Sequence, residues 1–229
     1  MTLAVSPPVV SLPQAGPRRP PTERKRTKRF DISRTNRAVE RLIATTDNPR
    51  HRYLLHAYSR HRYLQIAGRV EEIFAPEMTV AEPVYRFNML GTTTTLAGAE
   101  AVKKVYREWT RTAQCIFYTD NEKLAVSDNM IVSTSTRYQQ TPGSILAADG
   151  APLDPDAFYL MKTAEHMICP YDDRGRWVGA DVWEYDESVR EIIALDPTMV
   201  ITAEQSGRLL APLIKPLPAH NPFTAAMAV

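Results

Sequence analysis

The chain has few of the features that mark secreted or membrane-spanning proteins. Its 229 residues include only two cysteines, Cys115 and Cys169, which are too few for a disulfide scaffold and form no C-x-x-C pair. No stretch reaches the roughly 18 apolar residues that a membrane-spanning helix needs. The first residues also lack the basic-then-apolar order of a secretory signal. We therefore expect a cytoplasmic protein, without a membrane partner, that folds around one sizeable core.

Net charge is also small, but it is unevenly distributed. The formal charge of +2 divides into +6 for residues 1–30 and −4 for residues 31–229. Six of the 18 prolines lie within the first 21 residues. We interpret residues 1–30 as a basic, proline-rich, solvated arm, residues 31–186 as the folded domain, and residues 187–229 as an extension with a short helix and a proline-rich tail. An acidic body argues against nucleic acid as a partner, so an RNA- or DNA-associated role of the arm ranks last among the hypotheses.

Sequence motifs for cofactors and metals are missing. The chain has no G-x-G-x-x-G, no Walker A loop, no H-E-x-x-H and no G-x-S-x-G. His51, His56 and His61 recur every five residues, a spacing that turns each one away from the last on a helix, so they do not converge on one ion. We predict neither a cofactor nor a metal site.

Hydrophobic periodicity predicts helices first and strands later. Helical spacing covers Ser33–Thr46, Arg50–Phe74 with a break at Gly68, and Ala99–Thr112. Between them we expect a short strand, Met78–Val84, and a polar loop, Tyr85–Leu96. A period of two then predicts strands, and a capping box at Thr202 predicts a last helix to Ile214; the strands are Cys115–Thr119, Glu122–Ser127, Met130–Tyr138, Ala157–Cys169 and Trp177–Tyr185. This order indicates an α+β fold, a cone-shaped barrel in which a curved, mostly antiparallel sheet wraps around N-terminal helices and encloses a pocket.

One segment resembles a known enzyme family. The passage Ile73-Phe74-Ala75-Pro76-Glu77-Met78-Thr79-Val80-Ala81-Glu82-Pro83-Val84 resembles the helix-to-strand passage of ketosteroid isomerases, in the nuclear transport factor 2-like (SnoaL-like) superfamily. Ala97–Tyr106 is similar to the family's next helix. The resemblance implies that Glu82 is the catalytic base. It also implies that Tyr58, which lies 24 residues earlier, holds the oxyanion.

A carboxylate opposite a tyrosine can take a proton from carbon while the phenol stabilises the oxygen that gains charge. The resemblance also implies a second carboxyl-type group on a late strand, where Glu165 and His166 are both candidates. Strand alternation allows only one of these two side chains to face inward. Further candidates for substrate binding are Arg62, His61, Tyr85, Asn88, Arg137, Tyr138, Tyr159 and Trp183.

The first functional hypothesis is a cofactor-independent lyase or dehydratase that uses acid–base catalysis on a hydrophobic aromatic small molecule. One version of it releases formaldehyde from a lignin-derived diarylpropane. The alternatives are a ketosteroid isomerase-like or polyketide cyclase-like isomerase, and a non-catalytic ligand-binding or scaffold module. We also expect a homo-oligomer, either a dimer or a trimer.

Overall fold

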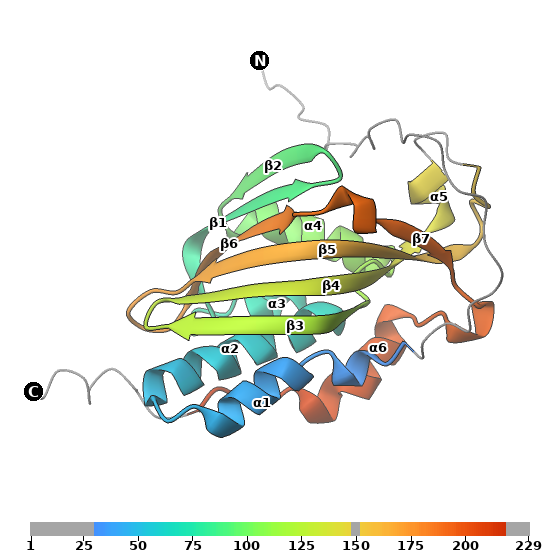
Figure 1. Ribbon diagram of the computed structural model, residues 1–229. Coiled ribbons are helices and arrows are strands. Elements are labelled where there is room, and N and C mark those ends of the chain that lie inside the picture. Colours follow the sequence, from blue (N-terminus) through green and yellow to red (C-terminus); the bar gives the residue numbers. More distant parts are fainter. Residues whose placement is uncertain (1–29, 148–151, 219–229) are drawn as a thin grey trace, which may run out of the picture.

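The computed structural model describes residues 30–147 and 152–218. The basic arm predicted for residues 1–30 lies outside the described residues, except for Phe30. Figure 1 shows long strands in front, helices α2, α3 and α4 behind them, and α1 and α6 along the lower edge. The predicted α+β class, a curved sheet packed around helices, is confirmed.

The N-terminal helices begin and end at local signals. A 3-10 turn, η1 (Ile32–Arg34), precedes α1 (Arg37–Thr45). Helix α2 (Pro49–Ile66) begins after Asn48, whose side chain accepts hydrogen bonds from two backbone N–H groups. Gly68, which has a φ of 69°, separates it from α3 (Val70–Ile73). The break predicted at Gly68 is therefore confirmed. Glycine suits this position because it adopts a positive φ without the steric cost of a Cβ atom.

The predicted loop Tyr85–Leu96 is wrong, because the segment is a β-hairpin. Strand β1 (Thr79–Met89) pairs antiparallel with β2 (Thr92–Ala97). Leu90 and Gly91 both have positive φ, 55° and 72°, as a tight type I′ hairpin turn requires. The four threonines of β2 suit a strand, but without an apolar alternation they gave no strand signal.

The remaining strands complete one mixed sheet. Helix α4 (Ala99–Arg111) leads into β3 (Phe117–Ser127), β4 (Met130–Pro142), β5 (Phe158–Pro170) and β6 (Trp177–Glu184). The strand order is β2-β1-β6-β5-β4-β3, and because β2 and β3 at the two ends do not pair, the sheet is not closed into a barrel. All pairs are antiparallel except β1 with β6. At this parallel pair Gly179 permits a close approach, because a Cβ there would lie 1.9 Å from the Val84 carbonyl oxygen.

Short elements tie the C-terminal part to the sheet and helices. They are α5 (Gly143–Leu146), η3 (Glu187–Val189), β7 (Glu191–Ala194), η4 (Pro197–Met199), α6 (Ala203–Leu210) and η5 (Ala211–Leu213). Strand β7, which the sequence did not predict, pairs with β5. The capping box at Thr202 and Gln205 is confirmed by both of its hydrogen bonds.

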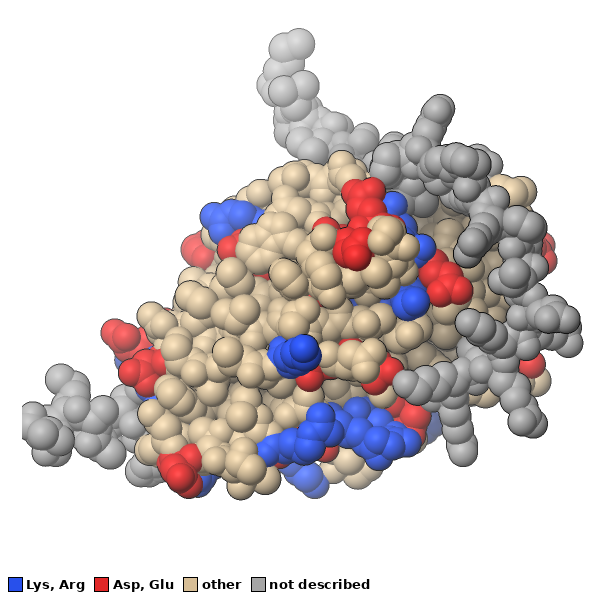
Figure 2. All heavy atoms as spheres, in the orientation of Figure 1, with Lys and Arg blue, Asp and Glu red and all other residues tan. Residues whose placement is uncertain are grey.

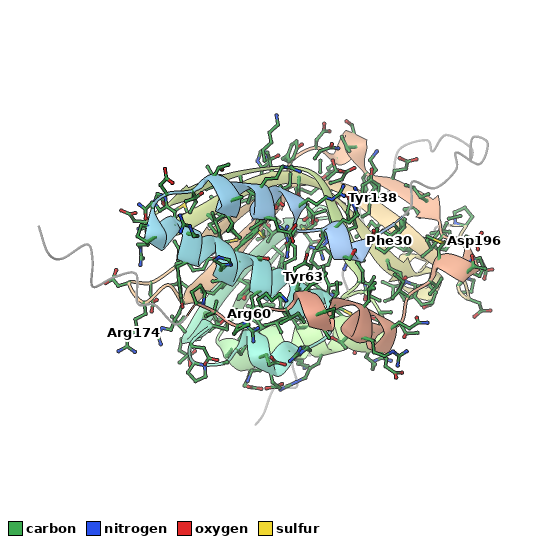
Figure 3. All side chains as sticks on the ribbon, turned by 90° about the horizontal axis from the view of Figure 1, so that it is seen from below. Phe30, Arg60, Tyr63, Tyr138, Arg174 and Asp196 are labelled. Atoms are coloured by element: carbon green, nitrogen blue, oxygen red, sulfur yellow. The ribbon has the colours of Figure 1, made fainter. Side chains whose placement is uncertain are left out.

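Buried side chains form two main clusters. The larger fills the cone between α2, α4 and the inner face of the sheet, and it includes Leu54, Tyr58 and Trp177. The second lies where α2, α6 and the starts of β3 and β5 meet, with Phe30 and Tyr63 among its members and Tyr138 packed against it; all three are labelled in Figure 3. Figure 2 shows few charged side chains over the strands, whereas Lys and Arg gather along the lower edge near α1.

Candidate functional site

A cavity lies inside the cone, between helix α2 and the inner face of the sheet. Its volume is about 60 Å³, which is room for roughly four to six waters. Six of the residues singled out in the sequence line it: Tyr58, His61, Arg62, Tyr85, Arg137 and Glu165. Aromatic side chains form much of the remaining wall, including Tyr106, Trp109 and Trp177.

The sequence left Glu165 and His166 as alternatives, and the structure turns Glu165 inward. Glu165 is 7% exposed and lines the cavity. His166 is exposed on the outer face, where its ring stacks on Tyr185 at 4.0 Å. Trp183 pairs with His166 across β5 and β6 and is on the same outer face. Of the two alternatives, Glu165 is therefore the inward residue, and His166 and the candidate binding residue Trp183 lie outside the cavity.

The prediction that Glu82 faces the pocket opposite Tyr58 is also wrong. Glu82 is exposed, and its carboxylate lies beside Gly98 instead. The pairing of β1 with β6 shifts register between Thr79 and Val84, and after this irregularity Tyr85 is the inward residue. The neighbouring proline fits such an irregular position.

Three other predicted binding residues lie outside the cavity. Asn88 accepts a hydrogen bond from the Thr93 hydroxyl within the hairpin. Tyr138 packs against the second core cluster. Tyr159 belongs to a small third cluster, and its hydroxyl accepts a hydrogen bond from the Asp154 backbone at 3.0 Å. None of the three is among the residues that line the cavity.

A buried ion pair forms one side of the cavity. Arg62 donates to both carboxylate oxygens of Glu122, at 2.5 and 2.9 Å, and the side chains are 6% and 2% exposed. Arg62 also donates to the Tyr58 hydroxyl at 2.6 Å. Burial alone would lower the pKa of Arg62, but Glu122 and Tyr58 raise it, so the guanidinium stays charged. Removing one partner of such a buried pair lowers the stability of the fold by about 3–5 kcal/mol. We therefore regard the pair as structural support for the cavity wall.

Sequence reasoning missed Glu122, which a β-bulge turns inward. In β3, Asp120 pairs with Thr136 while Lys123 pairs with Thr134, so β3 carries one extra residue. Asn121 supplies the bulge with a φ of 53°. Phe117 and Thr119 face inward before the bulge, and Glu122, Leu124 and Val126 do so after it. The Asp120-Asn121 pair within an alternating run was the available signal.

Glu165 and Arg137 form the second charged pair, and it is looser. Arg137 Nη1 lies 3.7 Å from Glu165 Oε2, beyond hydrogen-bond distance, while the Thr163 hydroxyl donates to Glu165 Oε1 at 3.0 Å. The Arg137 guanidinium lies over the Phe117 ring at 4.0 Å. Burial raises the pKa of Glu165, and the opposing charge of Arg137 limits that rise.

Neutral polar groups complete the lining. Burial and the nearby Arg62 charge lower the pKa of His61 to about 3, so its imidazole is neutral at physiological pH. Its ring packs edge-on against Trp177 at 4.0 Å. Burial raises the pKa of Tyr58 and Tyr85 well above the usual value, so both phenols keep their protons. His61 Nε2, Tyr85 Oη and Arg137 Nε are buried without a hydrogen-bond partner among the described residues.

Within residues 30–147 and 152–218, no group of three or more His, Cys, Asp or Glu side chains is arranged to hold a metal ion. The helices of the same residues include none that is long and apolar enough to cross a membrane.

Comparisons with known proteins find matches among solved structures only. No protein-family model matches the chain, and no curated protein matches it. Solved structures that match include a candidate polyketide cyclase from Xanthomonas campestris, with 8% identity over 61% of this chain and 94% of that one and a TM-score of 0.46. A nuclear transport factor 2-like protein from Novosphingobium aromaticivorans, described as having a cystatin-like fold, matches with 15% identity over 66% and 88% of the two chains and a TM-score of 0.41.

A third structure is of a Mycobacterium tuberculosis protein in complex with estradiol-17β-hemisuccinate. It matches with 13% identity over 60% of this chain and 96% of that one, and a TM-score of 0.42. All three matches have 15% identity or less and TM-scores below 0.5. The chemistry therefore has to be argued from the residues of this cavity.

Proposed function

We propose that the chain is a cofactor-independent enzyme that moves a proton on a small carbonyl compound, as an isomerase or cyclase does, with Glu165 as the proton-accepting group. The observation that carries this proposal is the position of Glu165. Its carboxyl group lines the cavity, is 7% exposed, and is only loosely paired with Arg137. Burial that raises the carboxyl pKa brings a general base closer to the working pH.

The other cavity residues suit the charge that such a reaction develops. When a base takes a proton from carbon next to a carbonyl group, negative charge moves to the carbonyl oxygen. The Tyr85 hydroxyl donates to that oxygen, and neutral His61 donates from Nε2 in the tautomer that carries the hydrogen there. Tyr58 is engaged with Arg62 and Glu122, so it supports the wall next to these donors.

A lyase or dehydratase that acts on an aromatic substrate is the second candidate. The aromatic wall of Tyr106, Trp109 and Trp177 favours it, because flat rings stack on such side chains. The size of the cavity argues against a diarylpropane, since about 60 Å³ is far below the roughly 300 Å³ or more of pockets that enclose drug-sized ligands. Glu82 and His166, which the lyase hypothesis used, lie outside the cavity. We therefore rank the isomerase or cyclase reading first.

The test is proton exchange at carbon in deuterium oxide, followed by NMR on a panel of small ketones, enones and oxo acids without added cofactor. Because general acid–base catalysis contributes about 10²–10⁴-fold, Glu165→Gln should slow exchange by about 100-fold or more. Glu82→Gln decides between the two candidate bases, and we expect it to keep the wild-type rate. Glu191→Gln, on the exposed edge strand β7, is the matched control. Wild-type exchange in Glu165→Gln would refute this assignment, and formaldehyde release from a diarylpropane would favour the lyase.

A further inference from the structure

The two arginines of the cavity differ in how their donors are used. Both Nη atoms of Arg62 are occupied, because they donate to the Thr35 carbonyl, the Asn36 side chain, Glu122 and Tyr58. The side chain of Arg137 has no hydrogen bond to another described residue, and its Nε is buried without a partner. Its only anionic neighbour within 4 Å among the described residues is Glu165, at 3.7 Å. Arg137 is therefore the cation of this cavity that has donors to spare.

The position of Arg137 is fixed by packing. Its guanidinium lies over the Phe117 ring at 4.0 Å, and its side chain is 14% exposed. A flat cation held over a ring by stacking keeps its N–H edge free for another partner. A buried donor that has no acceptor is costly, and an anionic oxygen placed at this edge removes that cost. The planar fork of arginine matches the two oxygens of a carboxylate.

The rest of the cavity limits the size and the other functional groups of a ligand whose carboxylate binds Arg137. The space of about 60 Å³ accepts a molecule of only a few non-hydrogen atoms. His61 is neutral and Tyr85 is uncharged, so neither competes with Arg137 for an anion. Both present a polar atom without a partner, which suits a carbonyl oxygen in the same small molecule.

We propose that the cavity binds a small carboxylic acid that also carries a carbonyl group, a 2-oxo or 3-oxo acid, with its carboxylate held by Arg137. This inference rests on the proposed function for the site but makes a separate claim about the substrate class. Glu165 already shares the guanidinium, and its charge opposes that of the ligand. We therefore expect weak binding, with a Kd on the order of 1 mM.

The binding test uses pyruvate and acetoacetate against their uncharged amides, measured by calorimetry and by the fluorescence of Trp109 and Trp177, which line the cavity. Hydrogen bonds to charged groups are worth about 1.5–3 kcal/mol, so each amide should bind about 10- to 100-fold more weakly than its acid. Arg137→Gln should weaken binding of the acids by the same factor. Arg86→Gln, which changes an exposed arginine of β1 paired with Asp181, is the matched control and should leave binding unchanged.

Glu165→Gln separates a ligand-binding role of Arg137 from a structural one. Loss of the competing charge should tighten binding of the acids by roughly threefold or more, although proton exchange is lost. Circular dichroism and Tm establish folding, and Arg137→Lys, which keeps the charge but not the fork, replaces Arg137→Gln if that variant does not fold. Equal affinities of acid and amide, or of wild type and a folded Arg137 variant, would overturn the inference. Binding of acids without carbon exchange would refute the proposed reaction only, whereas exchange confined to uncharged ketones would refute this inference only.

Discussion

At the scale of single residues, burial and neighbouring charges give the ionisable groups of the cavity different protonation states. Arg62 stays charged because the Glu122 carboxylate pairs with it. His61, one position away from Arg62 in the same helix, is neutral because nothing compensates its charge. Glu165 lies between these extremes, since burial raises its pKa while Arg137 opposes the rise. A site with one fixed ion pair, one neutral imidazole and one adjustable carboxyl is suited to proton transfer.

The neutral state of His61 makes stability depend on pH. The pKa of His61 is about 3 in the folded chain and 6.5 in the reference state, so the unfolded chain binds more protons between these values. Its contribution to stability is complete above about pH 6.5 and is lost as the pH falls toward 3. As the pH falls from about 6.5 to about 5, protonation of His61 in the unfolded chain should lower the free energy of unfolding of the wild type by about 2 kcal/mol, at about 1.4 kcal/mol per pH unit. We expect His61→Phe to lack this loss.

Urea unfolding at several pH values measures this difference, and any constant offset from repacking beside Trp177 cancels in the comparison. Identical pH slopes for the two proteins would mean that His61 accepts a proton in the folded state.

At the scale of elements, the bulge in β3 decides what faces the cavity. Without the extra residue, strand alternation would turn Asn121 inward and Glu122 outward, away from Arg62. Asn121 holds a φ of 53°, which glycine adopts freely, asparagine tolerates and β-branched residues resist. We expect Asn121→Gly to stay within about 0.5 kcal/mol of wild type and Asn121→Val to lose about 1–2 kcal/mol.

Equilibrium urea unfolding of these two variants checks the expectation. A valine variant as stable as the glycine variant would show that the bulge is not held in this conformation.

The same element shows where prediction from sequence stops. Helix α4, the capping box at Thr202 and the hairpin around Asp172 were predictable because their signals lie within a few neighbouring residues. The position of Tyr58 and Arg62 at the cavity was predictable from the resemblance and from helical spacing. Glu122 was not predictable in the same way, because its role depends on Arg62, which lies 60 residues away, and on a bulge of one residue.

The register shift in β1 had the same effect on Glu82. The resemblance correctly placed this segment at the passage from helix to strand, with β1 beginning at Thr79. It did not determine which carboxylate faces the cavity, because an irregularity in pairing turns the side chains that follow it. The fold can therefore be predicted from patterns of several residues. The identity of the proposed base, by contrast, depends on which side of the sheet a single side chain faces.

At the scale of the whole molecule, the C-terminal part belongs to the same packed structure as the cone. Ser206 donates to the carbonyl of Ile66 at the end of α2, at 2.7 Å. The buried Gln140 side chain of β4 exchanges hydrogen bonds with the backbone of Ile201, at 2.9 and 3.0 Å. Helix α6 and Ile201, which precedes it, thus link the helix that carries Tyr58, His61 and Arg62 to the strand that carries Arg137, so they support the cavity from outside.

Two adjacent leucines of α6 test how closely this part is integrated. Leu210 is fully buried in the second core cluster, whereas Leu209 is 48% exposed. Leu210→Ala should cost about 2–5 kcal/mol, because it removes buried methyl groups and leaves a cavity, and Leu209→Ala should stay within about 0.5 kcal/mol. Urea unfolding followed by tryptophan fluorescence, to which Trp177 of the first core cluster contributes, reports the effect inside the cone. If Leu210→Ala shifted only a local transition and left the tryptophan signal at its wild-type midpoint, α6 would be an independent appendage and could not position the cavity walls.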